Sequence, residues 1–288
     1  MLRISEISFP GFNIGSFSVN SVAFKLGSFE IAWYALIITA GIICAILYAV
    51  AETKKMGLST DELLDFAIVA IPAGIIGARL YYVLSKPDSF NGFYDIINIR
   101  NGGLAIYGAL IAGALVVLLM CYIKKVNYGA FGDAVMPGIL LAQGIGRWGN
   151  FMNGEAFGSE TEIFCRMGIN NVLTGYRTIY VHPTFLYESL WNIAGFLLIF
   201  FIFRRIKQYD GQVLYITCAW YGLGRMFIEG LRADSLYTHI GELSFRTSQV
   251  LAGIILEVCV ALLIYFHFRR PTKPLFYKKP QSKQNNKK

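Results

Sequence analysis

The sequence predicts an all-α, polytopic integral membrane protein with about seven transmembrane helices and long loops on the outer face. Hydrophobic residues make up 55% of the 288 residues and charged residues only 15%, whereas soluble domains carry about 25% charged residues. The apolar residues form long runs, and a helix needs about 20 largely apolar residues to cross a bilayer. Most runs approach that length, which leaves no room for a large soluble domain.

Seven apolar runs are the expected transmembrane helices. They cover Ile31–Ala51, Leu63–Leu84, Leu104–Ile123, Phe131–Ile145, Thr184–Phe203, Val213–Ile228 and Val250–Phe268. The fourth and sixth runs are short, and they reach spanning length only together with the polar motifs that flank them. Two polar segments are longer than a connection requires, Met152–Pro183 and Ala233–Thr247, and long loops in compact proteins are usually functional or disordered.

Basic residues are unevenly distributed between these runs. With seven spans and the N-terminus outside, the inner segments carry fifteen lysines and arginines and the outer segments carry eight. Cytoplasmic loops are normally the richer in Lys and Arg. The chain is therefore predicted to lie in the cytoplasmic membrane with its N-terminus outside and its C-terminus in the cytoplasm.

Three stretches are expected along the chain. Residues 1–29 form an N-terminal extracytoplasmic segment without the apolar core and cleavage site of a removable signal peptide. Residues 30–268 form the membrane domain, and residues 269–288 form a basic cytoplasmic tail whose composition predicts disorder. Such a tail suits the anionic head groups of the lipid bilayer, and nucleic acid is not an expected partner.

Cysteine, histidine and acidic residues are not arranged as a metal or hydrolase site. Four of the five cysteines lie in or beside apolar runs, where they behave as small hydrophobes, and only Cys165 lies in a polar loop. The three histidines are far apart in the sequence, and neither a paired-acid Mg²⁺ motif nor a Gly-x-Ser-x-Gly elbow is present. We expect no bound metal and no cofactor.

The most informative motif follows the fourth run directly. Residues 146–158 read Gly-Arg-Trp-Gly-Asn-Phe-Met-Asn-Gly-Glu-Ala-Phe-Gly. Arg147 at a membrane face needs a partner or a function, because a guanidinium at mid-bilayer costs about 2.5–3.5 kcal/mol. The glycines allow a tight turn and close approach to a ligand, and Arg147 offers a planar fork of donors that suits a phosphate. A turn whose polar groups only satisfy one another is the alternative.

A second polar motif lies in the sixth run. Tyr221, Arg225 and Glu229 follow one another at intervals of four residues, so they share one face of a helix. A structural ion pair between Arg225 and Glu229 is one interpretation. The other interpretation is that Arg225 and Arg147, which are expected at the same depth in the membrane, form a pocket for an anion. No matching excess of buried carboxylates is expected beside these two arginines.

Two further segments carry polar groups at the ends of runs. Asn101-Gly-Gly-Leu-Ala-Ile-Tyr-Gly108 opens the third run, where a helix N-terminus favours negative charge. His182-Pro-Thr-Phe-Leu-Tyr-Glu188 opens the fifth run. His182 precedes a proline and is expected in extended backbone, in a loop role rather than a catalytic one.

These motifs resemble those of the bacterial prolipoprotein diacylglyceryl transferase family. Residues 146–158 match all eight fixed positions of its signature, G-R-x-G-N-F-x-N-x-E-x-x-G, and residues 182–188 match H-P-[ST]-x-x-Y-E. Tyr34 and Arg79 also lie at positions that fit the family. Tyr107 stands where the family often has histidine, so a mechanism that needs an imidazole base at that position is not expected here.

The resemblance implies an enzyme that transfers a diacylglyceryl group from phosphatidylglycerol to the lipobox cysteine thiol of a prolipoprotein, forming a thioether and releasing glycerol 1-phosphate. It implies phosphatidylglycerol and a prolipoprotein signal peptide as partners, and a bacterial inner-membrane location. The residues expected to act in catalysis are Arg147, Arg225, Tyr34, Tyr107 and Tyr221. Those expected to bind the lipid are Arg147, Asn150, Asn153, Glu155, Gly158 and Glu229.

Two other classes of function compete with this one. A transporter for an anionic solute would use the same arginines as its binding site, although transporters commonly have repeated halves and no repeat is evident here. A structural membrane protein is the third class, and it leaves the arginines within the spans without a purpose.

Overall fold

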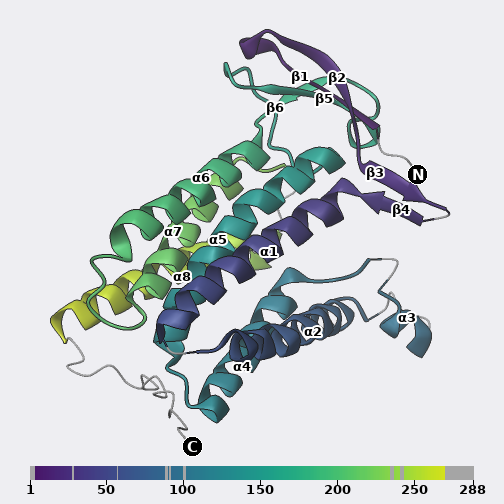
Figure 1. Cartoon of the computed structure of the whole chain (residues 1–288). Helices are drawn as coiled ribbons and strands as arrows, with labels where there is room; N and C mark the ends of the chain where they lie inside the picture. Colours follow the sequence, from purple (N-terminus) through teal and green to yellow (C-terminus); the bar gives the residue numbers. More distant parts are fainter. Residues whose placement is uncertain are drawn as a thin grey trace, which may run out of the picture. The chain divides into compact units, whose positions relative to one another are not determined.

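The computed structural model groups the chain into two compact units (Figure 1). Of the described residues, one unit contains those up to Tyr48 and those from Gly132 to Arg269, and the other contains those of Ala49–Phe131. The structure describes residues 4–27, 29–56, 58–87, 90, 92–99, 102–233, 237–240 and 243–269. The predicted basic tail, apart from Arg269, lies outside the described residues.

Long helices form most of the first unit. They are α1 (Trp33–Thr53, which runs on into the second unit), α5 (Tyr128–Asn153), α6 (Thr184–Leu198), α7 (Gln212–Glu229) and α8 (Thr247–Phe268). A π-helical turn, η5 (Ile199–Phe203), prolongs α6, and α6 packs on α7, which packs on α8. Leu140, Ile199 and Val213 form a buried contact between α5, η5 and α7.

An antiparallel sheet also belongs to the first unit, so the expectation of an all-α chain needs correction. Its strands are β1 (Ile4–Phe9), β2 (Ile14–Asn20), β5 (Met167–Asn170) and β6 (Ile179–Val181), in the order β2-β1-β5-β6. β1 pairs with β5 through Glu6 opposite Asn170, which joins the N-terminal segment to the loop after α5. Ile7, Ile169 and Val181 are buried, and Phe151, Phe157 and Phe185 pack against them or beside them. The sheet is therefore anchored on the 146–158 motif.

The remaining elements of this unit are short. They are two hairpins, β3 (Val22–Leu26) with β4 (Phe29–Ala32) and β7 (Tyr237–Ile240) with β8 (Leu243–Arg246), and the 3-10 turns η1 (Pro10–Phe12) and η4 (Val172–Thr174). The first hairpin leads directly into α1, and the second leads into α8.

The second unit is built on two packed helices. Its elements are η2 (Lys54–Met56), α2 (Thr60–Ser85), α3 (Phe93–Ile97) and α4 (Ile106–Lys124). α2 begins with a capping box between Ser59 and Glu62. The helices approach closely where Gly77 faces Gly108, since a side chain at either glycine would overlap the other's backbone. Arg79 donates to carbonyl oxygens of α3, those of Asp95 and Ile96, and to those of Gly102 and Gly103 in the loop before α4.

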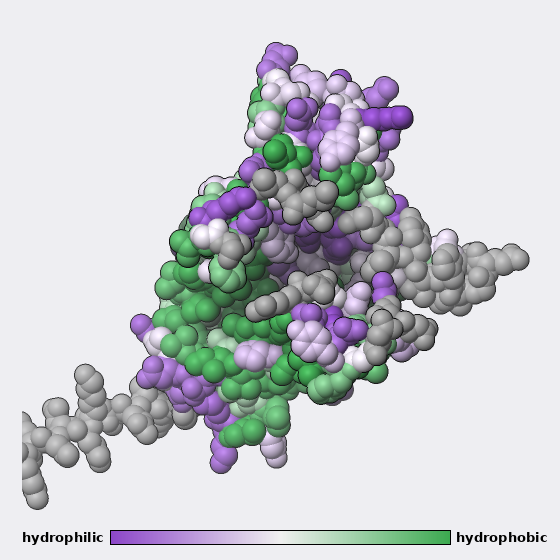
Figure 2. Space-filling model, turned by 90° about the vertical axis from the view of Figure 1, so that its right-hand side faces the viewer, coloured by the Kyte–Doolittle hydropathy of each residue, from purple (hydrophilic) through white to green (hydrophobic). Residues whose placement is uncertain are grey.

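Within the described part of the chain, five helices are long and apolar enough to cross a membrane. They are α1, α2, α4, α6 with its π-helical extension, and α8. Large apolar side chains on them face outward, as with Leu47, which is 64% exposed, and Figure 2 shows hydrophobic residues in green over the helical part. Side chains of this kind suit a lipid environment. α5 and α7, the two other expected spans, are also helical, and they carry the arginine motifs.

Candidate active site

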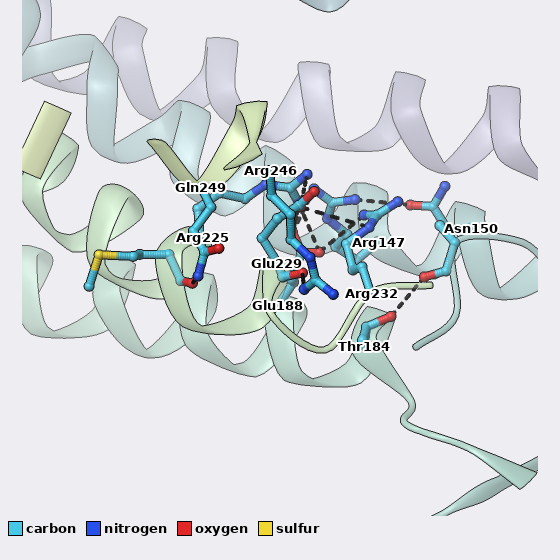
Figure 3. A network of polar contacts seen from close by, with 11 residues as sticks. Arg147, Asn150, Thr184, Glu188, Arg225, Glu229, Arg232, Arg246 and Gln249 are labelled. Carbon is cyan, nitrogen blue, oxygen red and sulfur yellow. Dashed lines mark hydrogen bonds and ion pairs between the residues drawn. The ribbon is translucent and has the colours of Figure 1, made fainter. Parts of the chain in front are cut away.

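Three arginines and two glutamates come together from three helices and the segment that follows the last of them (Figure 3). We call Arg147, Glu188, Arg225, Glu229 and Arg232 the arginine–glutamate cluster. Arg147 lies near the end of α5, Glu188 in the first turns of α6, and Arg225 and Glu229 near the end of α7, with Arg232 just beyond it. The cluster thus joins the 146–158 motif to both other polar motifs of this unit.

Glu188 is the centre of the cluster. Its carboxylate lies 2.6 Å from Nη2 of Arg147, 3.1 Å from Nη1 of Arg225 and 3.4 Å from Nη1 of Arg232. Glu229 lies 2.6 Å from Nη2 of Arg225 and 3.9 Å from Nε of Arg232. The interaction of Arg225 with Glu229 confirms the helical spacing predicted from the sequence.

The sequence predicted no matching excess of buried carboxylates beside the arginines, and the cluster contains two carboxylates for three guanidiniums. Glu188 is 4% exposed and Glu229 is 2% exposed. Without partners two buried carboxylates would be very costly, and so would the guanidiniums. Three guanidiniums share two carboxylates, however, so the cluster retains one positive charge in excess. Guanidinium donors in fixed positions are well suited to a phosphate or carboxylate group.

The 146–158 motif begins inside a helix, whereas the sequence suggested that the helix ends before it. α5 continues to Asn153, because neighbouring residues cover its glycines: Gly149 lies against the ring of Tyr34, and Gly144 lies against Ile193. A larger residue at Gly149 would collide with Tyr34. Tertiary packing therefore outweighs the low helix propensity of glycine and asparagine.

The turn comes at the end of the motif. Gly154 has φ of +61°, and its carbonyl oxygen accepts from the buried Asn171 at 2.8 Å. Gly158 pairs with Arg232 as an isolated β-bridge, and its N–H donates to the carbonyl oxygen of His182 at 2.9 Å. A Cβ atom at Gly158 would overlap His182 and the backbone of Leu231. Gly158 therefore brings the segments before α6 and after α7 together beside the cluster.

The side-chain amides of the motif link Arg147 to Glu155 by hydrogen bonds. The Asn150 side-chain oxygen accepts from Arg147 at 3.4 Å. Oε1 of Glu155 accepts from Asn150 at 3.4 Å and from Asn153 at 2.9 Å. All four side chains are partly buried, so one hydrogen-bonded network runs from Glu155 to the arginine–glutamate cluster.

Two of the three tyrosines selected from the sequence lie in this unit. Tyr34, in the first turn of α1, covers Gly149 two residues from Arg147. Tyr221 packs against the buried contact of α5 and α7 and interacts electrostatically with Arg147. Tyr107 belongs to the second unit, where its ring centre lies 6.3 Å from that of Tyr81, and its role remains a prediction.

A third polar group lies where the sheet joins α6. The Tyr187 hydroxyl is 3.3 Å from Sγ of Cys165 and 3.4 Å from Nδ1 of His182. Partial burial holds the pKa of His182 below its ordinary value, so the imidazole is neutral at neutral pH. His182 lies in the loop between β6 and α6, as the sequence predicted.

Two cluster residues, Glu188 and Arg232, and the neighbouring Arg246 were not selected as site residues from the sequence. Glu188 was seen only as the end of a motif, and Arg232 and Arg246 only as basic residues of outer segments. Arg246 donates to the backbone carbonyl oxygen of Glu229, next to the cluster (Figure 3). The available signal was Glu188 itself, since a carboxylate at the start of an apolar helix requires a buried cation nearby.

The fold and the cluster define a helical membrane protein with a buried polar site that suits an anionic group. Among the residues that the structure describes, no three His, Cys, Asp or Glu side chains are grouped to hold a metal ion. The family model for prolipoprotein diacylglyceryl transferase matches residues 21–265, and the chain belongs to this family.

Curated relatives cover nearly the same length. The chain is 42% identical to phosphatidylglycerol–prolipoprotein diacylglyceryl transferase 1 of Clostridium perfringens, over 90% of this chain and 99% of that protein. It is 42% identical to the enzyme of that name from Listeria welshimeri, over 86% of this chain and 90% of that protein. It is 41% identical to the one from Streptococcus agalactiae, over 86% and 96%.

Proposed function

We propose that this protein transfers the diacylglyceryl group of phosphatidylglycerol to the lipobox cysteine of prolipoproteins, the first step of lipoprotein maturation. The observation that carries the proposal is the arginine–glutamate cluster, in which three partly buried guanidiniums are held by two buried carboxylates. It lies in a chain of the prolipoprotein diacylglyceryl transferase family whose apolar helices suit the bilayer in which such a lipid resides.

The chemistry requires stabilisation of an anion. The sulfur of the cysteine thiolate attacks the glyceryl carbon, a C–S bond forms, and the C–O bond to the phosphate breaks. The electron pair of the broken C–O bond stays on the phosphate oxygen, and the leaving group is glycerol 1-phosphate. Donors fixed in a water-poor site stabilise such developing charge most effectively, and a positive field also favours loss of the proton from a thiol of pKa about 8.5.

The side chains divide this work according to their position. Arg147 and Arg225 hold the phosphate, with Arg232 as a third cation, while Glu188 and Glu229 keep the guanidiniums in place. This assignment gives each buried carboxylate a positioning role, and the remaining positive charge is directed to the substrate.

The polar groups around the cluster receive the rest of the lipid head group. Asn150, Asn153, Glu155 and Gly158 line the side toward the turn of the motif, and the hydroxyls of Tyr34 and Tyr221 donate hydrogen bonds.

The proposal for Tyr107 is that its hydroxyl also positions the lipid. Tyr107→Phe should then reduce turnover and Tyr107→His should retain it, without a change in the lower limb of the pH–rate profile.

We further propose seven spans in the bacterial inner membrane, with the N-terminus outside and the C-terminus in the cytoplasm. Cysteine labelling in intact spheroplasts tests this orientation, in a chain whose native cysteines are replaced by alanine. A cysteine at Leu173, in the loop after α5, should react with an impermeant reagent, and a cysteine at Lys55, after α1, should react only after lysis. The reverse result would refute the orientation.

One assay tests the activity. Purified protein is incubated with phosphatidylglycerol vesicles and a lipobox peptide, and the thioether product and glycerol 1-phosphate are measured by mass spectrometry. We expect both products in equal amounts, no product with a Cys→Ser peptide, and full activity in EDTA. Absence of thioether with intact lipid binding would refute transfer, and release of trapped anion from proteoliposomes would instead indicate a transporter.

A further inference from the structure

Two tryptophans bind each other reciprocally across α6 and α7. The indole N–H of Trp191 donates to the backbone carbonyl oxygen of Trp220 at 2.9 Å, and the indole N–H of Trp220 donates to the carbonyl oxygen of Trp191 at 2.9 Å. The two ring systems stack, with centroids 4.5 Å apart and planes inclined by 20°. Each partly buried indole thereby obtains the partner that its N–H requires.

Each tryptophan also lies on a glycine of the opposite helix. Gly195 follows Trp191 by four residues and Gly224 follows Trp220 by four residues. A Cβ atom at Gly195 would overlap the indole of Trp220, and one at Gly224 would overlap the indole of Trp191. The same pattern, Trp followed by Gly at i+4, thus occurs in both helices, and each copy fits the other. We call these four residues the tryptophan lock.

The lock lies directly beside the arginine–glutamate cluster. Glu188 precedes Trp191 by three residues, on the same side of α6, and Arg225 follows Gly224. A helix rises about 1.5 Å per residue, so a slip of α6 along α7 by one residue would displace Glu188 by about that distance. The 3.1 Å contact between Glu188 and Arg225 would then be lost or remade elsewhere.

Helices in lipid need specific contacts to fix their register, because hydrocarbon surrounds their apolar side chains in any register. Small residues that allow close approach and polar groups that bond across the interface provide such contacts. The lock combines both. On the other side of α6, the indole N–H of Trp148 donates to the hydroxyl of Ser189 at 3.1 Å, which fixes α5 against the residue next to Glu188.

We infer that Trp191 and Trp220 are positioning residues for the transfer reaction. The lock holds α6 and α7 at the register in which Glu188 reaches Arg147 and Arg225 together, and in which both guanidiniums face the departing phosphate. This inference depends on the proposed function. The lock acts on the transition state more than on lipid binding, since the phosphate acquires its additional charge only as the C–O bond breaks.

The test uses Trp191→Phe, Trp220→Phe and the double variant, which keep an aromatic ring and lose the indole N–H. Circular dichroism reports the stack, because two stacked indoles give a coupled pair of bands that disappears when either is replaced. We expect kcat to fall about 10-fold to 100-fold in each single variant, as for small displacements of reacting groups, with KM for phosphatidylglycerol within about twofold. The double variant should lose little more, because each single change already breaks the lock.

A glycine series provides the control for folding. Gly195→Ala and Gly224→Ala should displace the indoles and lower kcat in the same way. Gly253→Ala in α8 should not, because among the described residues the only atom of another residue within 4 Å of a Cβ atom there is the sulfur of Met226, at 3.9 Å. Folded yield is checked by gel filtration. If an alanine variant fails to fold, the kcat values of the phenylalanine variants alone test the inference.

Three outcomes would overturn the inference. A wild-type protein without coupled indole bands would disprove the lock, and folded Trp→Phe variants with unchanged kcat would disprove its role in positioning. A wild-type protein that shows the coupled bands but lacks transferase activity would disprove the proposed function, and the lock would then only pack two helices.

Discussion

Helices α5 and α7 bury ionic groups at both of their ends, and the two groups differ in composition. At one end Asp133 of α5 accepts from the N–H groups of Gly211 and Leu214 at 2.8 and 2.7 Å and lies 2.8 Å from Nζ of Lys207. Lys207 also lies 2.8 Å from Asp210. We call Asp133, Lys207 and Asp210 the aspartate–lysine cluster. At the other end is the arginine–glutamate cluster.

The aspartate–lysine cluster is a helix cap. Gly211, at the N-cap of α7, has no side chain to satisfy the first N–H groups, and Asp133 supplies the missing carboxylate from the neighbouring helix. Burial alone would lower the pKa of Lys207, but Asp133 and Asp210 hold it above its ordinary value. The amine is therefore charged at neutral pH, and it compensates a carboxylate that the helix N-terminus also stabilises.

The comparison shows what distinguishes a structural ionic group from one prepared for a ligand. One lysine and a helix N-terminus serve the carboxylates of the first cluster, whereas three guanidiniums share only two carboxylates in the second. Both clusters hold helices together, but among the described side chains that form them, only those of the second carry more positive than negative charge. The predictions below test this difference, beginning with the largest expected effect.

Glu188→Gln should have the largest effect. It leaves three guanidiniums with a single carboxylate, and breaking a buried pair on one side typically costs about 3–5 kcal/mol. We expect a lower yield and a much lower Tm in detergent micelles, with kcat also reduced. Added phosphate should raise the Tm of this variant more than that of the wild type, because an anion replaces the lost charge. Equal Tm values for the two proteins would contradict a charge-compensating role for Glu188.

Arg147→Lys keeps the charge and loses the planar fork of donors. Loss of a transition-state donor typically costs about 10²–10³-fold in rate, and we expect a decrease of that size in kcat with little change in Tm. Arg166→Lys is the matched control, since Arg166 donates only to carbonyl oxygens of its own exposed loop among its described hydrogen bonds. Near-normal turnover of Arg147→Lys would assign Arg147 to helix packing alone.

Asp133→Ala should show the opposite pattern at the other cluster. Loss of a helix cap typically costs about 0.5–2 kcal/mol, so Tm should fall by several degrees while kcat of the folded enzyme stays within about twofold. Asp65→Ala is the control, because Asp65 is an exposed partner of Lys124 and such pairs contribute about 1 kcal/mol or less. A selective loss of kcat in Asp133→Ala would show that the two clusters are coupled.

The helices were largely predictable from the sequence, because apolar runs of spanning length have few alternatives. Each of the seven runs lies in or largely within one of the long helices. The sheet was not predictable: its strands have three to seven residues, and Glu6 pairs with Asn170, far away in the sequence. The continuation of α5 through Gly149 depends on Tyr34, which no local pattern reveals.

The site was predictable where its groups share one helix. Arg225 and Glu229 follow from a spacing of four residues, and Arg147 follows from its motif. Glu188 and Arg232 were missed because their pairing depends on the register of α6 against α7, and that register is set by the tryptophans and glycines between them. Periodicity within a single helix contains no information about the register between two helices.

The smallest expected effect is a pH dependence at the arginine–glutamate end. Burial lowers the pKa of His182 in the folded chain, so below about pH 6.5 the unfolded chain takes up a proton that the folded chain does not. Stability contributed by the neutral imidazole is therefore complete above that pH, and it is lost as the pH falls toward the folded-state pKa. His182→Gln removes this titration, and the Tm of the variant should fall slightly less than that of the wild type between pH 7.5 and 5.5. A steeper decrease in the variant would show that His182 is protonated in the folded protein.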